Sequence, residues 1–213
     1  MTRIAIFASG NGTNAEHIAA YFSGNSQIRV ALILSNREDA YVLKRAENLG
    51  IPSKVFNRKM FCQTDEVIQW LKDSSIHFIV LAGFLWLVPP DIINVYRGRI
   101  INIHPALLPD FGGKGMFGDV VHKAVLKAGV QTSGITIHYV DENYDHGNII
   151  FQATCNVDSN DTPESLAEKI HQLEYKYYPV VIENIINGKL DEIRRMEEKA
   201  KYKINLRKND HDK

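Results

Sequence analysis

Residues 4–14 read IAIFASGNGTN: an apolar run, a glycine-rich turn and the start of a stretch with helical spacing. Glycines let a backbone approach a ligand closely, and the amides at a helix N-terminus favour an anion. The stretch therefore predicts the first strand, loop and helix of an α/β fold, with a phosphate cradle in the loop. A tight strand-to-helix turn that binds nothing is the alternative.

The loop at residues 9–14 can be compared with known phosphate-binding motifs. It is not a Walker A loop, because the Gly-Lys-Ser/Thr ending is missing. Its spacing Gly10-x-Gly12-x-x-Ala15 matches the looser dinucleotide fingerprint, which also requires an acidic residue at the end of the second strand. That strand instead ends in Ser35-Asn36-Arg37. A nicotinamide cofactor is therefore disfavoured, and a nonenzymatic nucleotide-binding module stays open as an alternative.

Outward from this unit, apolar runs alternate with amphipathic stretches through the first hundred residues. Uninterrupted apolar runs are typical of parallel strands that are covered on both faces. The rhythm predicts a doubly wound, mostly parallel, Rossmann-like α/β sheet. The predicted strands are residues 4–8, 30–34, 78–82 and 100–103, and the predicted helices are residues 14–22, 39–49, 65–72 and 90–96.

The second half of the chain has a different pattern. After a glycine-rich loop at residues 110–118 and a helix ending near residue 127, two strands are predicted at residues 134–140 and 148–157. Their short connection predicts an antiparallel pair. Thr162-Pro163 predicts the N-cap and first residue of a long helix, which Pro179 is expected to kink or break.

The predicted organisation is a single domain over residues 1–190, with a phosphate-binding half (about 1–100) and a catalytic half (about 100–190). Residues 191–213 are mostly charged and predict a solvated appendage with at most a short strand or helix.

The composition indicates which binding partners and which cellular compartment are expected for this protein. The 213 residues carry 25 basic and 25 acidic side chains, so no global field attracts nucleic acid or an anionic membrane. Cys62 and Cys155 lie far apart without a CxxC motif, which argues against a disulfide framework or structural zinc. The first apolar run is too short for a signal peptide or membrane span. We expect a cytoplasmic monomer or homodimer that acts on small molecules without a metal.

Asn102 and His104 share one face of the predicted strand that Pro105 ends, because side chains alternate along a strand. An amide that donates to an oxyanion beside an imidazole that moves a proton suits acyl-type chemistry. Asp145, in the turn at residues 141–147, could orient His104 and favour its charged form. Two satisfied polar residues and a solvated turn are the alternatives.

Two further polar residues keep two interpretations each. His138 shares a face with Thr136 and lines the same site or is an ordinary core histidine. Glu174 falls near the edge of the buried stripe of the long helix, where a carboxylate is solvated or binds a substrate hydroxyl or amine.

Five motifs, taken together and in order, resemble the phosphoribosylglycinamide formyltransferases of the folate-dependent formyltransferase superfamily, from about residue 3 to 189. The motifs are SGNGTN (9–14), LAGF (81–84), NIHPALLP (102–109), SGITIH (133–138) and DENYDHG (141–147). The resemblance implies transfer of a formyl group from 10-formyltetrahydrofolate to the amine of 5-phosphoribosylglycinamide, in purine biosynthesis. Other formyltransferases or hydrolases that use this folate are the rival enzymes. They are expected to need an additional RNA-binding or regulatory domain.

Roles carried over by the resemblance are catalysis, substrate binding and folate binding. It implies that Asp145 keeps His104 cationic. An arginine that the family often carries is Trp86 here, and another expected near Thr64 is absent, with only Arg58 and Lys59 nearby. The implied residues are Asn102, His104 and Asp145 for catalysis; Gly12, Thr13, Asn14 and Glu174 for the substrate; and Leu85, Trp86, Leu87, Val88, Asn102, Val140, Asp141 and Asp145 for the folate.

Overall fold

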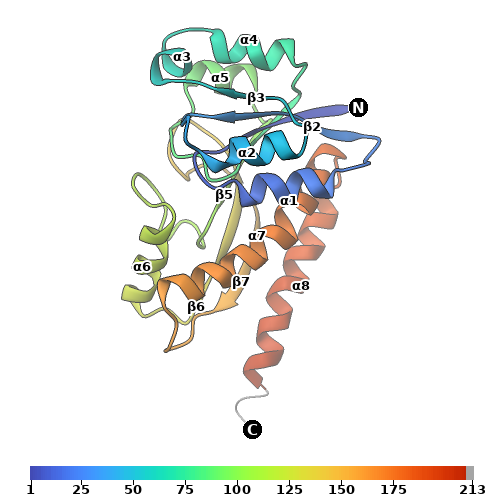
Figure 1. Cartoon of the computed structure of the whole chain (residues 1–213). Helices are drawn as coiled ribbons and strands as arrows, with labels where there is room; N and C mark the ends of the chain where they lie inside the picture. The colour runs from blue at the N-terminus through green and yellow to red at the C-terminus, as the bar shows by residue number, and fades with distance from the viewer. Residues whose placement is uncertain (210–213) are drawn as a thin grey trace. The chain divides into compact units, whose positions relative to one another are not determined.

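The glycine-rich turn follows β1 (Thr2–Phe7) and leads into α1 (Thr13–Tyr21), as the sequence predicts (Figure 1). The structure is a computed structural model that describes residues 1–209. The chain forms two structural units. Unit 1 consists of Met1–Asn102 and Tyr139–Tyr144, and unit 2 consists of Ile103–His138 and the chain from Asp145 onward. The boundary therefore falls inside the strand that carries Asn102 and His104.

Unit 1 is built around parallel strands. β1 pairs in parallel with β2 (Ile28–Ser35) and β4 (Phe78–Leu81); β2 also pairs with β3 (Ser53–Val55), and β4 with β5 (Ile100–His104). The strand order of the whole sheet is β3-β2-β1-β4-β5-β6-β7. Because the order reverses between β1 and β4, the loops after these two strands lie where open α/β sheets bind ligands.

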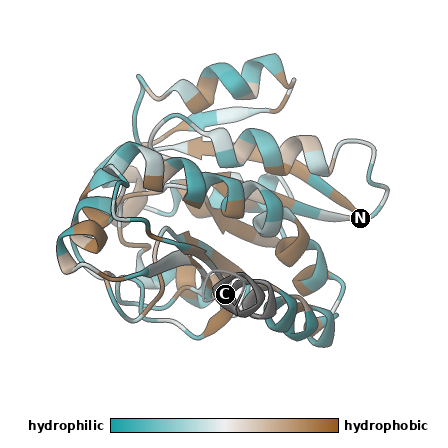
Figure 2. Ribbon diagram, turned by 90° about the horizontal axis from the view of Figure 1, so that it is seen from below, coloured by the Kyte–Doolittle hydropathy of each residue, from teal (hydrophilic) through white to brown (hydrophobic). Residues whose placement is uncertain are grey.

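The helices of unit 1 cover this sheet because their apolar stripes match the buried strands. They are α1, α2 (Tyr41–Asn48), α3 (Arg58–Cys62), α4 (Glu66–Asp73) and α5 (Pro90–Val95). Figure 2 shows hydrophobic residues concentrated in the strands and alternating hydrophobic and hydrophilic bands on the helices. One core cluster joins Phe7, Leu32, Phe56, Leu71 and Ile79, all at most 1% exposed.

Unit 2 contains the antiparallel pair that the sequence predicts. β6 (Thr132–Tyr139) pairs with β7 (Ile149–Asn156), with a register shift between Ile137 and His138. α6 (Asp119–Ala128) and α7 (Pro163–Ile186) pack together, and α8 (Leu190–Asn209) packs against β7 and α7.

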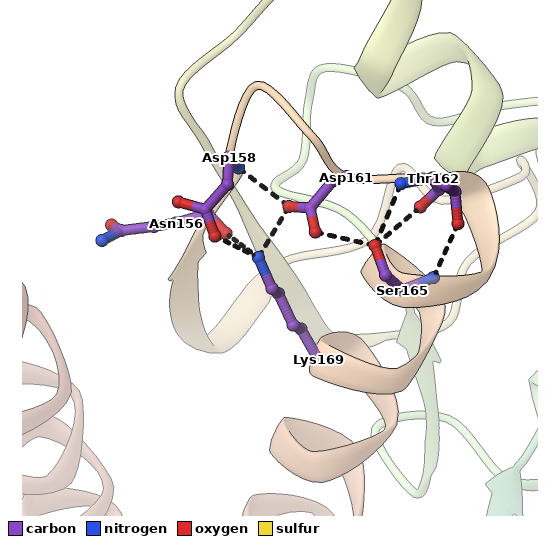
Figure 3. A network of polar contacts seen from close by, with 6 residues as sticks. All are labelled: Asn156, Asp158, Asp161, Thr162, Ser165 and Lys169. Carbon is purple, nitrogen blue, oxygen red and sulfur yellow. Dashed lines mark hydrogen bonds and ion pairs between the residues drawn. The ribbon is translucent and has the colours of Figure 1, made fainter.

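The start of α7 is fixed by local polar contacts, shown in Figure 3. Thr162 accepts from the Ser165 backbone amide at 3.2 Å, and the Ser165 hydroxyl accepts from the Thr162 amide at 3.0 Å. Lys169, one turn later, reaches Asp158 and Asp161, each at 2.6 Å. The predicted N-cap at Thr162 is therefore confirmed, with Ser165 completing a capping box.

Two features of the C-terminal part differ from the predictions. Of the kink or break expected at Pro179, the break is absent, because α7 continues beyond it to Ile186. Residues 191–213 were expected to form at most a short strand or helix, yet α8 runs for 20 residues and buries Ile193. The reason is tertiary, since Ile193 and Ala200 are buried where α8 packs against β7 and α7, which a charged sequence does not reveal. The last four residues, 210–213, lie outside the described chain.

Two short elements of unit 1, β3 and α3, were not predicted. Three residues of strand and five of helix are too short for a periodic pattern to show. Within residues 1–209, no helix combines the length and apolar character needed to cross a membrane.

Candidate active site

The loop after β1 takes a left-handed turn at Gly12, with φ 76° and ψ 23°. A side chain there would collide with Val42, since an ideal Cβ would lie 2.4 Å from Val42 Cγ2. Gly12 also caps α1, and a glycine has no side chain to cap the first helical amides. Gly12, Thr13 and Asn14 thus lie at a helix N-terminus whose dipole favours an anion.

The loop after β4 is tied to the loop after β1 through Ser9. The Ser9 hydroxyl, 2% exposed, accepts from the Leu85 amide at 3.0 Å, and the Ser9 amide donates to the Gly83 carbonyl at 3.0 Å. The hydroxyl of Tyr144 accepts from the Leu87 amide at 3.2 Å. Residues 85–88 are thereby brought together with the 139–144 segment of the same unit.

Trp86 lies half-buried against the aromatic core. Its ring is 6.0 Å from both Phe56 and Phe61, and Val140 packs against the same core cluster. The guanidinium of Arg58 lies over the Trp86 ring, 4.9 Å from its centroid. A cation that stacks on an aromatic face keeps its N–H edges available for an anionic ligand.

Asn102 is the last residue of unit 1 on β5, and its side chain is half-buried. It pairs in register with Leu81, at the end of β4. Two residues later along β5, in unit 2, His104 is only 3% exposed. Ile101 and Ile103, on the alternate positions, are in the core.

His104 lies against Asp145, although the two are far apart in the sequence. Nδ1 of His104 is 3.4 Å from Oδ2 of Asp145, and the Asp145 side chain is 11% exposed. Asp145 adopts a positive φ of 52°, an uncommon conformation for a residue with a side chain. The predicted pairing of these residues is present in the structure.

Two loop groups complete the surroundings of this pair. Nε2 of His104 is 2.8 Å from the Phe111 carbonyl, which can only accept, so Nε2 carries the hydrogen of this bond. The Gly113 amide donates to Asp145 Oδ2 at 3.0 Å. The glycine-rich loop at residues 110–118 therefore contacts both members of the pair.

His138 belongs to the same cluster. Its Nε2 lies 3.7 Å from Oδ1 of Asp145, and its side chain is 3% exposed. Of the two interpretations left open by the sequence, the geometry supports the one in which His138 lines the site. An imidazole therefore lies near each oxygen of the Asp145 carboxylate, His104 near Oδ2 and His138 near Oδ1.

Burial and the Asp145 charge act in opposite directions on the pKa of His104. Desolvation lowers its pKa below the ordinary 6.5, and this outweighs the opposing effects of Asp145 and the Phe111 carbonyl. Burial therefore opposes the expectation that Asp145 keeps His104 cationic, whereas the two acceptors beside the ring, the carboxylate at Nδ1 and the carbonyl at Nε2, favour it. Burial raises the pKa of Asp145, but His138, His104 and the Gly113 amide together hold it below 3.8.

Glu174 lies on α7 and is 6% exposed, so the solvated interpretation was wrong. Its neighbour one turn later, Tyr178, is fully buried, and burial together with the Glu174 charge raises the Tyr178 pKa well above 10. A buried carboxylate needs hydrogen-bonding partners, which makes it a suitable acceptor for hydroxyl groups.

The sequence did not single out Tyr144, Phe111 or Gly113 as site residues. Tyr144 had a visible signal, a phenol inside an acidic turn, whereas Phe111 and Gly113 act through backbone groups that no side-chain pattern reveals. Across the described residues 1–209, no three His, Cys, Asp or Glu side chains gather in a way that could hold a metal ion.

The chain resembles proteins of known family. The formyl transferase family model matches residues 2–182. The chain is 39% identical over 191 residues to "Phosphoribosylglycinamide formyltransferase" of Bacillus subtilis (strain 168), covering 87% of this chain and 95% of that protein. It is 41% identical over 186 residues to the chloroplastic protein of that name from Arabidopsis thaliana, and the match covers 84% of this chain and 64% of the plant protein.

Solved structures agree with the sequence matches. A phosphoribosylglycinamide formyltransferase from Bacillus halodurans superimposes with a TM-score of 0.78 at 38% identity, covering 87% of this chain and 95% of that chain. One from Anaplasma phagocytophilum gives a TM-score of 0.79 at 35% identity, covering 86% of each chain.

Proposed function

The chain belongs to the formyl transferase family, and we propose that it transfers the formyl group of 10-formyltetrahydrofolate to the amine of 5-phosphoribosylglycinamide. The products are phosphoribosyl-N-formylglycinamide and tetrahydrofolate, and the pathway is purine biosynthesis. The observation that carries the proposal is the His104–Asp145 pair, at 3.4 Å, in a chain whose relatives bear this enzyme's name.

The reaction needs one proton to move between two nitrogens. The neutral amine attacks the formyl carbon, a C–N bond forms, and the carbonyl electron pair moves onto oxygen. The tetrahedral species collapses as the bond from carbon to N10 of the folate breaks. The attacking nitrogen loses a proton and N10 gains one, so atoms and charge balance without an added reactant.

His104 is suited to this transfer in its neutral form. In the neutral tautomer that carries its hydrogen on Nδ1, facing Asp145, Nε2 accepts the amine proton and returns it to N10, a role typically worth about 10²–10⁴ in rate. Its Nε2 contacts Phe111, so the 110–118 loop exchanges this contact when substrate binds. Asp145 holds the Nδ1 side of the ring and stabilises the imidazolium formed in passing.

Asn102 is assigned to the developing oxyanion. Its amide donates to the carbonyl oxygen as charge builds there, and loss of such a donor costs about 10²–10³ in turnover. No metal is required, because the amide and the imidazole together stabilise the charge.

The remaining groups bind and orient the two substrates. Gly12, Thr13 and Asn14 receive the phosphate at the start of α1, and Glu174 accepts from the ribose hydroxyls. The pterin of the folate contacts main-chain groups of Leu85, Trp86, Leu87 and Val88, and of Val140, Asp141 and the turn up to Asp145. Arg58, stacked on Trp86, receives a carboxylate of the glutamate tail.

The two cysteines bear on the cellular compartment in which the protein acts. Cys62 and Cys155 are both free thiols, and burial raises the pKa of Cys155 to about 11, which leaves it unreactive. Free thiols in this arrangement support a reducing compartment such as the cytoplasm.

The test is a direct assay with both substrates. Synthetic phosphoribosylglycinamide and a 10-formylated folate analogue are mixed with the protein, and the absorbance of the deformylated folate is followed. Formation of the formylated acceptor is expected only when both are present. Release of formate without the acceptor would instead indicate a hydrolase, and binding without turnover a nucleotide-binding module.

A further inference from the structure

Arg45 of α2 forms two hydrogen bonds with Asn11, in the loop that precedes α1. Its Nε donates to the Asn11 carbonyl at 2.9 Å, and its Nη2 donates to Oδ1 of the Asn11 side chain at 3.0 Å. Both bonds span 34 positions of sequence, so they connect the loop to a separate helix. The Arg45 side chain is only 18% exposed.

The guanidinium is itself held in place by two other groups. Its Nη1 pairs with the carboxylate of Glu16 on α1, and its plane lies over the Tyr41 ring, 5.0 Å from the centroid. Nε, Nη1 and Nη2 therefore each have a partner within the protein. Three of the five N–H groups of Arg45 are thus used within the protein, and two of them fix the position of Asn11.

The bonds from Arg45 to Asn11 also fix the direction of the Gly12 N–H, because the two groups share one peptide. In a trans peptide the carbonyl and the N–H point in opposite directions. Because Arg45 holds the Asn11 carbonyl on its own side, the Gly12 N–H points to the opposite side. Turning this peptide over would exchange the two and present a carbonyl oxygen where the N–H had been.

Gly12 does not by itself prevent such a flip. Glycine accepts positive and negative φ almost equally, so its own sterics leave the peptide free to turn. A larger residue cannot supply the restraint, because Val42 leaves no room for a Cβ. Val42 does hold the loop on one side, where its amide donates to the Gly10 carbonyl at 3.1 Å. The Asn11–Gly12 peptide itself is held by Arg45.

We propose that Arg45 is a positioning residue that locks the Asn11–Gly12 peptide in the orientation required for binding the substrate phosphate. The inference rests on the proposed function and adds to it a residue outside the loop. Glu16 supports the lock by pairing with Arg45. Without the lock, the flipped peptide would repel the phosphate, while the folate site and the catalytic groups would stay as they are.

The variants are Arg45→Met, which removes all three donor nitrogens, and Arg45→Lys, which keeps the charge but not the paired geometry. Lys44→Met is the matched control, because Lys44 is the preceding residue of the same helix, is exposed and pairs with Glu47, at 2.7 Å. For Arg45→Met we expect KM for phosphoribosylglycinamide to rise about 10- to 100-fold. KM for the folate and kcat should stay within about twofold of wild type, and Arg45→Lys should fall in between.

A second readout separates positioning from general damage. The acceptor is compared with its dephosphorylated form, ribosylglycinamide. The wild type should prefer the phosphorylated acceptor strongly, and Arg45→Met should lose most of that preference, with Lys44→Met unchanged. Equal losses with both acceptors, or equal rises in the two KM values, would overturn the inference. An inactive wild type would instead contradict the proposed function.

Discussion

The Oδ2 atom of Asp145 lies 3.4 Å from Nδ1 of His104, and the imidazole is 3% exposed. The carboxylate thus orients a histidine that burial nevertheless leaves with a lowered pKa. The first prediction tests this pair. Asp145→Asn preserves the shape of the side chain but removes its charge, so turnover should fall by about 10²–10⁴.

The control for this variant is Asp73→Asn, the same substitution at an exposed aspartate at the end of α4, which should leave turnover unchanged. Circular dichroism checks that both variants are folded. Wild-type turnover in folded Asp145→Asn would show that the pairing has no catalytic role.

The protonation of His104 can be measured directly. Its folded pKa is lowered, so the imidazole should titrate with a midpoint below 6.5 and be neutral at pH 7. Its ring C–H resonance, assigned by comparison with His104→Asn, gives the midpoint by NMR. In Asp145→Asn the midpoint should move lower still, because the carboxylate opposes the effect of burial. A midpoint above 6.5 would restore the cationic histidine.

Stability should fall on mild acidification, and His122 should contribute. His122 is 3% exposed, its Nδ1 has no hydrogen-bond partner among the residues that the structure describes, and burial lowers its pKa below 6.5. A group with a lowered folded pKa binds more protons when unfolded, so the free energy of unfolding decreases as pH falls below 6.5. The slope is at most about 1.4 kcal/mol per pH unit for one proton.

Replacing His122 with Leu, which has no titratable group, should make this slope shallower. Urea unfolding at pH 7.5 and 5.5 measures it for both proteins. Because slopes are compared, a general loss of stability in the variant does not affect the conclusion. An unchanged slope would mean that His122 gains no proton on unfolding.

Gly12→Ala should damage phosphate binding selectively. The new Cβ would lie 2.4 Å from Val42 Cγ2 and 2.9 Å from Val42 Cα, so the loop and α2 must move apart. KM for the phosphorylated acceptor should rise at least about tenfold, with little change for the folate. Gly24→Ala is the control, since it has a similar φ of 78° but open space around it. Equal changes in both KM values would argue against a phosphate site at this loop.

Arg58→Met should weaken folate binding. The methionine keeps apolar contact with Trp86 but cannot bond a carboxylate, so KM for the folate should rise about tenfold. A folate analogue that lacks the glutamate should bind the two proteins equally. Lys54→Met is the control, because Lys54 stacks on Trp70 in the same way, at 4.5 Å. An unchanged KM would place the tail elsewhere.

Much of the fold was predictable because it is encoded locally. Parallel strands covered on both faces produce uninterrupted apolar runs, and β1, β2, β4 and β5 were found on that signal. The N-cap at Thr162 was found because its partner, Ser165, is three residues away. α8 was not, because its stabilising contacts are made with β7 and α7 rather than within its own charged sequence.

The candidate site, like the fold, was predictable from the sequence only in part. The residue types of the site, Asn102, His104, Asp145 and the glycine loop, were visible in the sequence, because chemistry restricts which side chains can serve. The tertiary structure alone decided that His104 is held with a lowered pKa, that Glu174 is buried and that Arg45 grips Asn11. Desolvation and contacts between distant residues exist only once the chain has folded, so no local pattern can carry them.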